Sequence, residues 1–131
     1  MSVEDVLAGG RRAAAQLLLD ACLIERKAGP PTFDPATGEY VQQWETVYAG
    51  PCRLKRSAGG DDTQLGDSQS VTLHQYPVRL PWDAVPEVRR EDRLTLTASD
   101  DAWAVGRPME VVDVGYSGTS TGRHLMVEDK S

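Results

Sequence analysis

The chain has 131 residues, of which 40% are hydrophobic and 26% charged, and its formal net charge at pH 7 is -6. This length is enough for a core without metals or disulfides, so we expect residues 1–131 to form a single domain. The longest apolar run, residues 13–19, is too short to span a bilayer, and no basic segment opens the chain as in a signal peptide. The negative charge also argues against sequence-specific DNA binding, although an acidic wall can surround DNA that has to slide past it.

Residues 3–19 predict the one helix, because their apolar side chains recur near the 3.6-residue period. Ser2 followed by Asp5 resembles a capping box in which Asp replaces Glu or Gln. Gly9 and Gly10 each weaken the middle of the helix by roughly 1 kcal/mol relative to alanine. We therefore expect a helix whose first half is loose until something packs on it.

From residue 20 onward the pattern changes to the alternation of half-buried strands. Turn-forming residues punctuate it: Asp34-Pro35 followed by Gly38 predicts a tight turn, and Gly50-Pro51 predicts a strand break. We expect strands at residues 21–26, 39–48, 52–56, 71–80, 92–97, 109–114 and 124–128. Such short strands separated by turns favour a mainly β fold, a small sandwich-like β-barrel with the N-terminal helix appended.

The strand at residues 71–80 has two irregular features. Its apolar residues change parity near His74 and Gln75, which predicts a bulge. Pro77 cannot donate a ladder hydrogen bond and favours an edge or bulged position.

The expected core follows from the alternation, since each strand must bury one face. It comprises Leu23 or its neighbours Cys22 and Ile24, together with Val47, Leu54, Val78, Leu94, Leu96, Val112 and Val114.

Two stretches rich in Gly and polar residues, 57–70 and 115–122, predict long mobile loops. The first is the longer, and loops of that length are usually functional or disordered. We expect it to order on assembly and to reach either a DNA channel or a neighbouring protein. Its candidate contact residues are Asp61, Asp62, Leu65 and Asp67.

The sequence contains no constellation typical of catalysis, a cofactor or a metal. His74 and His124 lie apart from any nucleophile-elbow or metal-ligand spacing. Cys22 and Cys52 lie in apolar or alternating stretches and are expected to be reduced core thiols, unless their Cα atoms are close enough for a disulfide. We therefore expect a non-enzymatic protein.

Two of the three tryptophans are candidates for contacts with other proteins. Trp44 lies on an alternating strand and is expected in the core, whereas Trp82 and Trp103 lie outside the strands. Exposed aromatic residues are enriched at protein interfaces, so these two are candidate interface residues.

Six stretches in order resemble the head-to-tail connector proteins of tailed phages of actinobacteria, also called head-completion or stopper proteins. They are DACLIER (20–26), FDPATGEY (33–40), WETVYAGPCR (44–53), YPVRLP (76–81), REDRLTLT (90–97) and VGRPMEVVD (105–113). Together with the helix they cover about four fifths of the chain, and their order carries the likeness more than any single motif.

The resemblance implies a virion protein of the phage neck, assembled in the host cytoplasm as a dodecameric or hexameric ring. Such a ring closes the DNA-filled head beneath the portal or adaptor and offers the tail terminator or tail tube protein a docking face. DNA passes through its lumen without sequence-specific binding, and no membrane is involved. Two alternatives remain open: a tail terminator or adaptor of the same connector, and a monomeric β-barrel binding module, which would need a basic groove with stacking aromatics.

Overall fold

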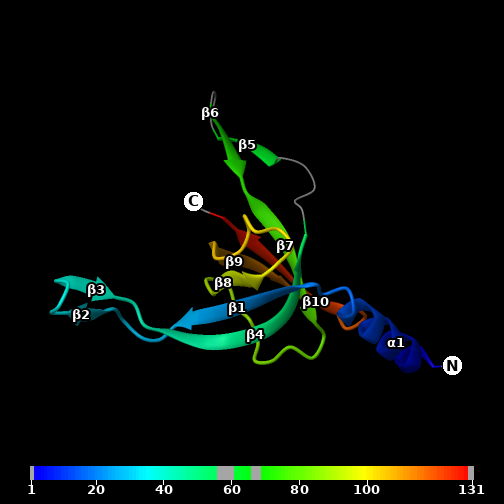
Figure 1. The fold of residues 1–131 in the computed structure, drawn as a ribbon. Helices are drawn as coiled ribbons and strands as arrows, with labels where there is room; N and C mark the ends of the chain where they lie inside the picture. Colours follow the sequence, from blue (N-terminus) through cyan, green and yellow to red (C-terminus); the bar gives the residue numbers. More distant parts are fainter. Residues whose placement is uncertain (1, 56–60, 66–68, 130–131) are drawn as a thin grey trace.

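The computed structural model describes residues 2–55, 61–65 and 69–129 (Figure 1). Six antiparallel strands close into a barrel in the order β1-β4-β7-β10-β9-β8. Their bounds are β1 Asp20–Lys27, β4 Trp44–Leu54, β7 Gln75–Pro81, β8 Arg93–Ala98, β9 Pro108–Gly115 and β10 Gly122–Glu128. The mainly β fold with an N-terminal helix, expected from the sequence, is confirmed.

The barrel interior is filled by the inward-facing residues of these strands and by Val88 from the β7–β8 connection. In β1, Cys22 and Ile24 face inward and Leu23 does not, which decides between the alternatives that the sequence left open. The buried residues are Cys22, Ile24, Val47, Tyr48, Cys52, Val78, Leu80, Val88, Leu94, Leu96, Met109, Val111, Leu125 and Val127.

Three register shifts interrupt the strand pairing, between Ala21 and Cys22, between Ile24 and Glu25, and between Met126 and Val127, and the last two change which residues are buried. Opposite the shift between Ile24 and Glu25, β4 buries the consecutive residues Val47 and Tyr48. The shift in β10 brings Val111 into the core instead of Val112, so the prediction for Val112 is wrong. Leu54 and Val114, also expected in the core, are partly buried against it.

Two prolines lie in barrel strands where the sequence argued for a break or an edge. β4 continues through Pro51, which pairs with Ala21 of β1, while pairing of β4 with β7 starts only at Arg53. The predicted break is therefore wrong. Pro51 has no N–H to donate, but no β7 residue pairs with it on that side of β4, so the strand can continue through it. β7 lies between β4 and β10 and is not an edge strand; Pro77 is accommodated because pairing with β4 starts one residue later, at Val78.

The helix α1 (Val3–Ala15) is shorter than expected, ending four residues before Leu19. Its start is as predicted, since the Asp5 N–H donates to the Ser2 Oγ at 3.2 Å. The backbone N–H groups of Leu17 and Leu18 each bond three residues back, which tightens the chain into a turn before β1. No residue of α1 is buried; the helix lies against β7 and β10 with one end and projects from the barrel with the other (Figure 1).

A hairpin of β2 (Thr32–Asp34) and β3 (Glu39–Val41) extends beyond the other end of β1 and β4 (Figure 1). The expected strand 39–48 is therefore divided between β3 and β4. The predicted turn is present: Asp34 accepts the N–H groups of Ala36 and Gly38 at 3.0 and 2.8 Å, and Gly38 has a φ of 74°.

The two predicted loops differ in the structure. Within residues 57–70, the described residues form β5 (Asp61–Leu65) and the start of β6 (Gln69–Leu73), so a loop without regular structure is wrong for them; residues 57–60 and 66–68 lie outside the described residues. The expected strand 71–80 is divided between β6 and β7 at His74, where the parity changes. The second loop does connect β9 to β10, and its mobility stays a prediction. No helix in the described part of the chain is long and apolar enough to cross a membrane.

Candidate functional site

Trp82, a candidate interface residue, lies at the junction of α1 and the barrel. The guanidinium carbons of Arg11 in α1 and Arg123 in β10 lie 3.8 and 3.9 Å from its ring centroid. The Arg123 Nε also donates to the Trp82 carbonyl at 2.9 Å. Cation–π attraction of this kind contributes about 0.5–1 kcal/mol per pair at exposed sites. The half-buried Trp82 therefore joins two parts of its own chain.

Arg11 ties the helix to the β9–β10 connection as well. Its Nε and Nη2 donate to the carbonyls of Ser120 and Gly118 at 3.1 and 3.2 Å. The stacking and these two hydrogen bonds hold one end of α1, while Val3 and Val6 at its other end are 71% and 57% exposed.

Trp103, the second candidate, is 85% exposed in the connection between β8 and β9. Its backbone N–H donates to Asp101 Oδ1 at 3.0 Å, and its carbonyl accepts from Arg107 Nε at 2.9 Å. Trp44 is not in the core, contrary to expectation: it is half-buried, with the Arg93 guanidinium 3.8 Å from its ring centroid. It lies where β4 leaves the barrel for the β2–β3 hairpin, so one face of its ring meets Arg93 instead of core side chains.

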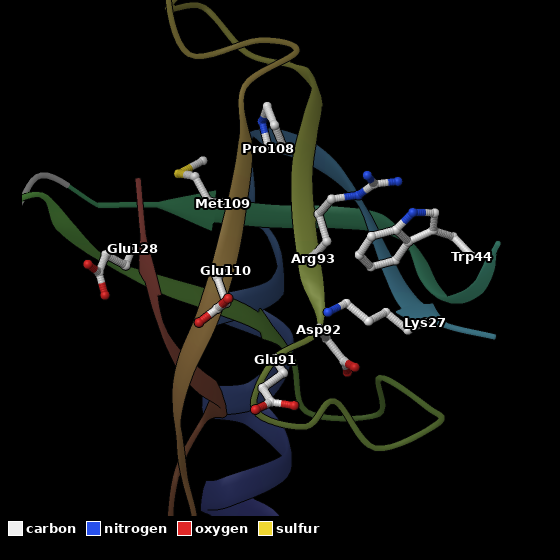
Figure 2. Close-up of a pocket in the computed structure, with 9 residues that line it drawn as sticks. All are labelled: Lys27, Trp44, Glu91, Asp92, Arg93, Pro108, Met109, Glu110 and Glu128. Atoms are coloured by element: carbon white, nitrogen blue, oxygen red, sulfur yellow. The ribbon is translucent and has the colours of Figure 1, made fainter. Parts of the chain in front are cut away.

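A surface hollow of about 170 Å³ lies beside Trp44. Pro108 and Met109 line it together with charged side chains, among them Lys27 of β1, Arg93 of β8, Glu110 of β9 and Glu128 of β10 (Figure 2). Asp92, 2% exposed, is already engaged: it accepts Nε and Nη2 of Arg26 at 2.9 Å each and the Arg89 N–H at 2.8 Å. The hydrogen bond to Asp92 raises the pKa of Arg26, with burial opposing it. Figure 2 shows the carboxylates of Asp92 and Glu110 pointing in different directions, and none of the described lining residues is Ser, Cys or His. The charged groups beside the hollow thus form a structural ion pair, Arg26 with Asp92, and not a set of catalytic groups directed at one point.

The remaining chemically reactive side chains are dispersed. His74 is exposed between β6 and β7, and the His124 Nε2 lies 2.9 Å from the Ser120 Oγ. Cys22 and Cys52 are free and buried; their hydrogen bond, then burial, raises the pKa of Cys22. Within the described residues, no group of three His, Cys, Asp or Glu side chains could hold a metal.

Among the described residues, most of the exposed large apolar side chains lie on or beside the two projections, while Val85, Trp103, Val105 and Tyr116 are exposed on connections between barrel strands. The helix surface consists of Val3 and Val6 of α1 together with Leu17 and Leu19 of the segment between α1 and β1, all more than half exposed. The hairpin surface consists of Phe33, Tyr40 and Val41; Tyr40 is 73% exposed, and its ring packs edge-on to Phe33 with centroids 5.4 Å apart.

The acidic candidates lie on a third arm. Asp61, Asp62 and Leu65 belong to β5, which pairs with β6, and Asp67 lies outside the described residues. The structure does not bring them together with Trp82 or Trp103 into one site.

Comparison with known proteins gives the fold and the family. No curated protein matches the chain. The solution structure of protein SF1141 from Shigella flexneri 2a is similar, with a TM-score of 0.58 at 12% identity, over 87% of this chain and 94% of that one. At this identity the likeness concerns the fold alone.

A family model matches residues 10–128, which include the end of α1 and all six barrel strands. The chain therefore belongs to the family described as Family of unknown function (DUF6093).

Proposed function

We propose that this chain is a non-enzymatic structural protein of the phage neck, a stopper-type ring subunit that closes the DNA-filled head and offers a docking surface to the tail. The observation that carries the proposal is the concentration of exposed apolar residues on two projections from a closed barrel. The order of the sequence stretches that resemble connector proteins supplies the phage context.

The two projections support assembly because a projecting element cannot bury its apolar side chains against its own barrel. The helix surface and the hairpin surface adjoin opposite ends of β1, since the helix precedes Asp20 and the hairpin follows Lys27. Large apolar residues left exposed together are typical of protein interaction sites. Each surface can therefore meet a neighbouring subunit or another neck protein, with the portal or adaptor above and the tail terminator or tail tube protein below.

The arrangement of polar residues supports a structural role over an enzymatic one. The most deeply buried carboxylate, Asp92, holds Arg26 and the backbone of Arg89, and is saturated by these bonds. A mainly β fold also favours a stopper over an adaptor, because adaptors are usually mostly helical.

Imaging tests the phage assignment directly. Tailed virions from the source would be purified and labelled with an antibody against this chain, and we expect the label at the neck. A chain that is made in infected cells but absent from purified virions would overturn the proposal.

Ring formation is tested with purified protein by mass photometry and negative-stain imaging. We expect rings, or concentration-dependent association, that Phe33→Ser weakens. Val85→Ser is the matched control, because Val85 is 77% exposed and lies on the β7–β8 connection, outside the hairpin. A strict monomer that binds single-stranded oligonucleotides would instead favour the binding module.

A further inference from the structure

Four basic residues lie together on the outer face of the barrel. Arg79 of β7 is the register partner of Arg53 on β4 and of His124 on β10, so the three form a row across adjacent strands. Their sequence neighbours Cys52, Leu54, Val78, Leu80 and Leu125 face the interior. Lys55 follows Arg53 by two residues on the same face. We call Arg53, Lys55, Arg79 and His124 the basic row.

The row is a place where like charges oppose one another. Arg79, then burial and Arg53, lower the pKa of Lys55. Burial, then Arg79 and Lys55, lower the pKa of His124. Like charges directly opposite each other on neighbouring strands destabilise a sheet, so this row costs the isolated protein free energy.

Among the side chains that the structure describes, Arg53, Lys55 and Arg79 form no ion pair, although the Asp20 carboxylate accepts the Leu54 N–H nearby at 3.1 Å. The arginines in ion pairs are elsewhere: Arg26, Arg90, Arg93 and Arg107. The Arg79 Nε is buried without a hydrogen-bond partner. In the described part of a chain with a net charge of -6, three cationic side chains without an ion-pair partner thus lie on one face.

We propose that the basic row is the surface through which each subunit contacts the phosphate backbone of double-stranded DNA. The inference rests on the proposed function, in which duplex DNA lies inside the ring. Neighbouring strands are about 4.8 Å apart, so β4 and β7 place the cations of Arg53, Lys55 and Arg79 side by side, and β10 adds the His124 imidazole as a neutral hydrogen-bonding group. Duplex DNA carries one charge per about 1.7 Å of its axis, and arginine suits phosphate geometry. The row includes no Phe, Tyr or Trp side chain for base stacking, which favours a duplex over a single strand.

The row also changes which part of the subunit is expected to face DNA. The sequence favoured the acidic stretch 57–70, which leaves the barrel between β4 and β7, the strands that carry Arg53 and Arg79. A basic face beside an acidic arm gives a contact that holds the duplex loosely and without sequence preference.

Fluorescence anisotropy with a mixed-sequence duplex of about 30 base pairs, titrated from 25 to 200 mM salt, tests the inference. The variant R53Q/K55Q removes two charges from the row, and R89Q/R90Q removes two from the exposed β7–β8 connection as a matched control. Each phosphate contact adds about 0.9 to the slope of log affinity against log salt, so R53Q/K55Q should reduce the slope by about 1.8 and the control should leave it unchanged. R79Q is a second variant, expected to reduce the slope by about 0.9.

Thermal melting at low salt provides a readout independent of DNA. If the charges of the row repel one another, R53Q/K55Q should melt at or above the wild-type midpoint temperature. That result would show that the weaker DNA binding of this variant is not caused by unfolding. Absence of duplex binding by wild type at 25 mM salt, or equal losses in both double variants, would overturn the inference. The inference would also be overturned if poly-glutamate displaced the labelled duplex as effectively as unlabelled duplex DNA does, because the row would then fit an acidic protein equally well.

The result separates this inference from the proposed function. Rings whose DNA binding does not depend on the row would overturn the inference alone. A strict monomer whose duplex binding does depend on the row would overturn the ring and leave the row as a DNA-binding surface.

Discussion

The barrel and the two projections use apolar residues in opposite ways. In the barrel, strands bury alternate side chains around Ile24, Val111 and Val127, each 0% exposed. In α1 no residue is buried, and in the β2–β3 hairpin Phe33 and Tyr40 remain largely in solvent. Burial stabilises the barrel without a partner, whereas the projections gain that stabilisation only from another surface. Substitutions in the barrel should therefore change stability, and substitutions on the projections should change association.

The largest effect is expected from Leu96→Ala. Leu96 is 1% exposed on β8 opposite Cys22, so truncation leaves a cavity in the barrel. The free energy of unfolding should fall by about 2–5 kcal/mol in denaturant melts. A loss below about 0.5 kcal/mol would mean that the barrel interior is not the stabilising core.

Asp92→Ala should have the next largest effect, a loss of about 1–3 kcal/mol in the same assay. The substitution leaves Arg26 and the Arg89 N–H without their acceptor. The control is Arg90→Gln, which removes an exposed pair with Asp113 at 3.5 Å and should cost under about 1 kcal/mol. Equal losses in the two variants would contradict the structural role of the buried ion pair.

Trp82→Leu tests the joint between the two regions. It removes both arginine stacks, each contributing about 0.5–1 kcal/mol, so the anchored end of α1 should loosen while the barrel remains folded. Hydrogen exchange should become faster in α1 and stay unchanged in β8 and β9. Equal acceleration in both would place Trp82 in the barrel's own cooperative unit.

The smallest effect on stability is expected from the hairpin double variant F33S/Y40S. The free energy of unfolding should change by under about 0.5 kcal/mol, as is usual for substitutions at surface positions. Self-association, measured by sedimentation velocity, should become weaker. Unchanged association would remove the hairpin surface from the assembly.

The sequence predicts the barrel better than the site because strand alternation is local. In β8 it correctly places Leu94 and Leu96 inside, whereas in β1 it leaves open whether Leu23 or its neighbours Cys22 and Ile24 face inward. It fails at Val112, since the register shift that turns Val111 inward depends on pairing between β9 and β10. Strand pairing also explains why Gly50-Pro51 lies within β4.

The site depends on contacts between distant parts of the chain. Arg26 and Asp92 are 66 positions apart, and Arg11 meets Ser120 across 109 positions. No local period signals such pairs, so the buried ion pair and the stack on Trp82 were missed. The dense positive charge at Arg53 and Lys55 was visible in the sequence, but its continuation to Arg79 and His124 requires the register of three strands.

The neighbouring thiols of Cys22 and Cys52 have a practical consequence. Gly50, two residues before Cys52, lies opposite Cys22, so both side chains share the closed interior, and the raised pKa of Cys22 leaves little reactive thiolate at neutral pH. A thiol reagent can label them only after β1 and β4 separate. The labelling rate therefore reports how often the barrel opens, and it can be measured within an assembled particle without introducing a new cysteine.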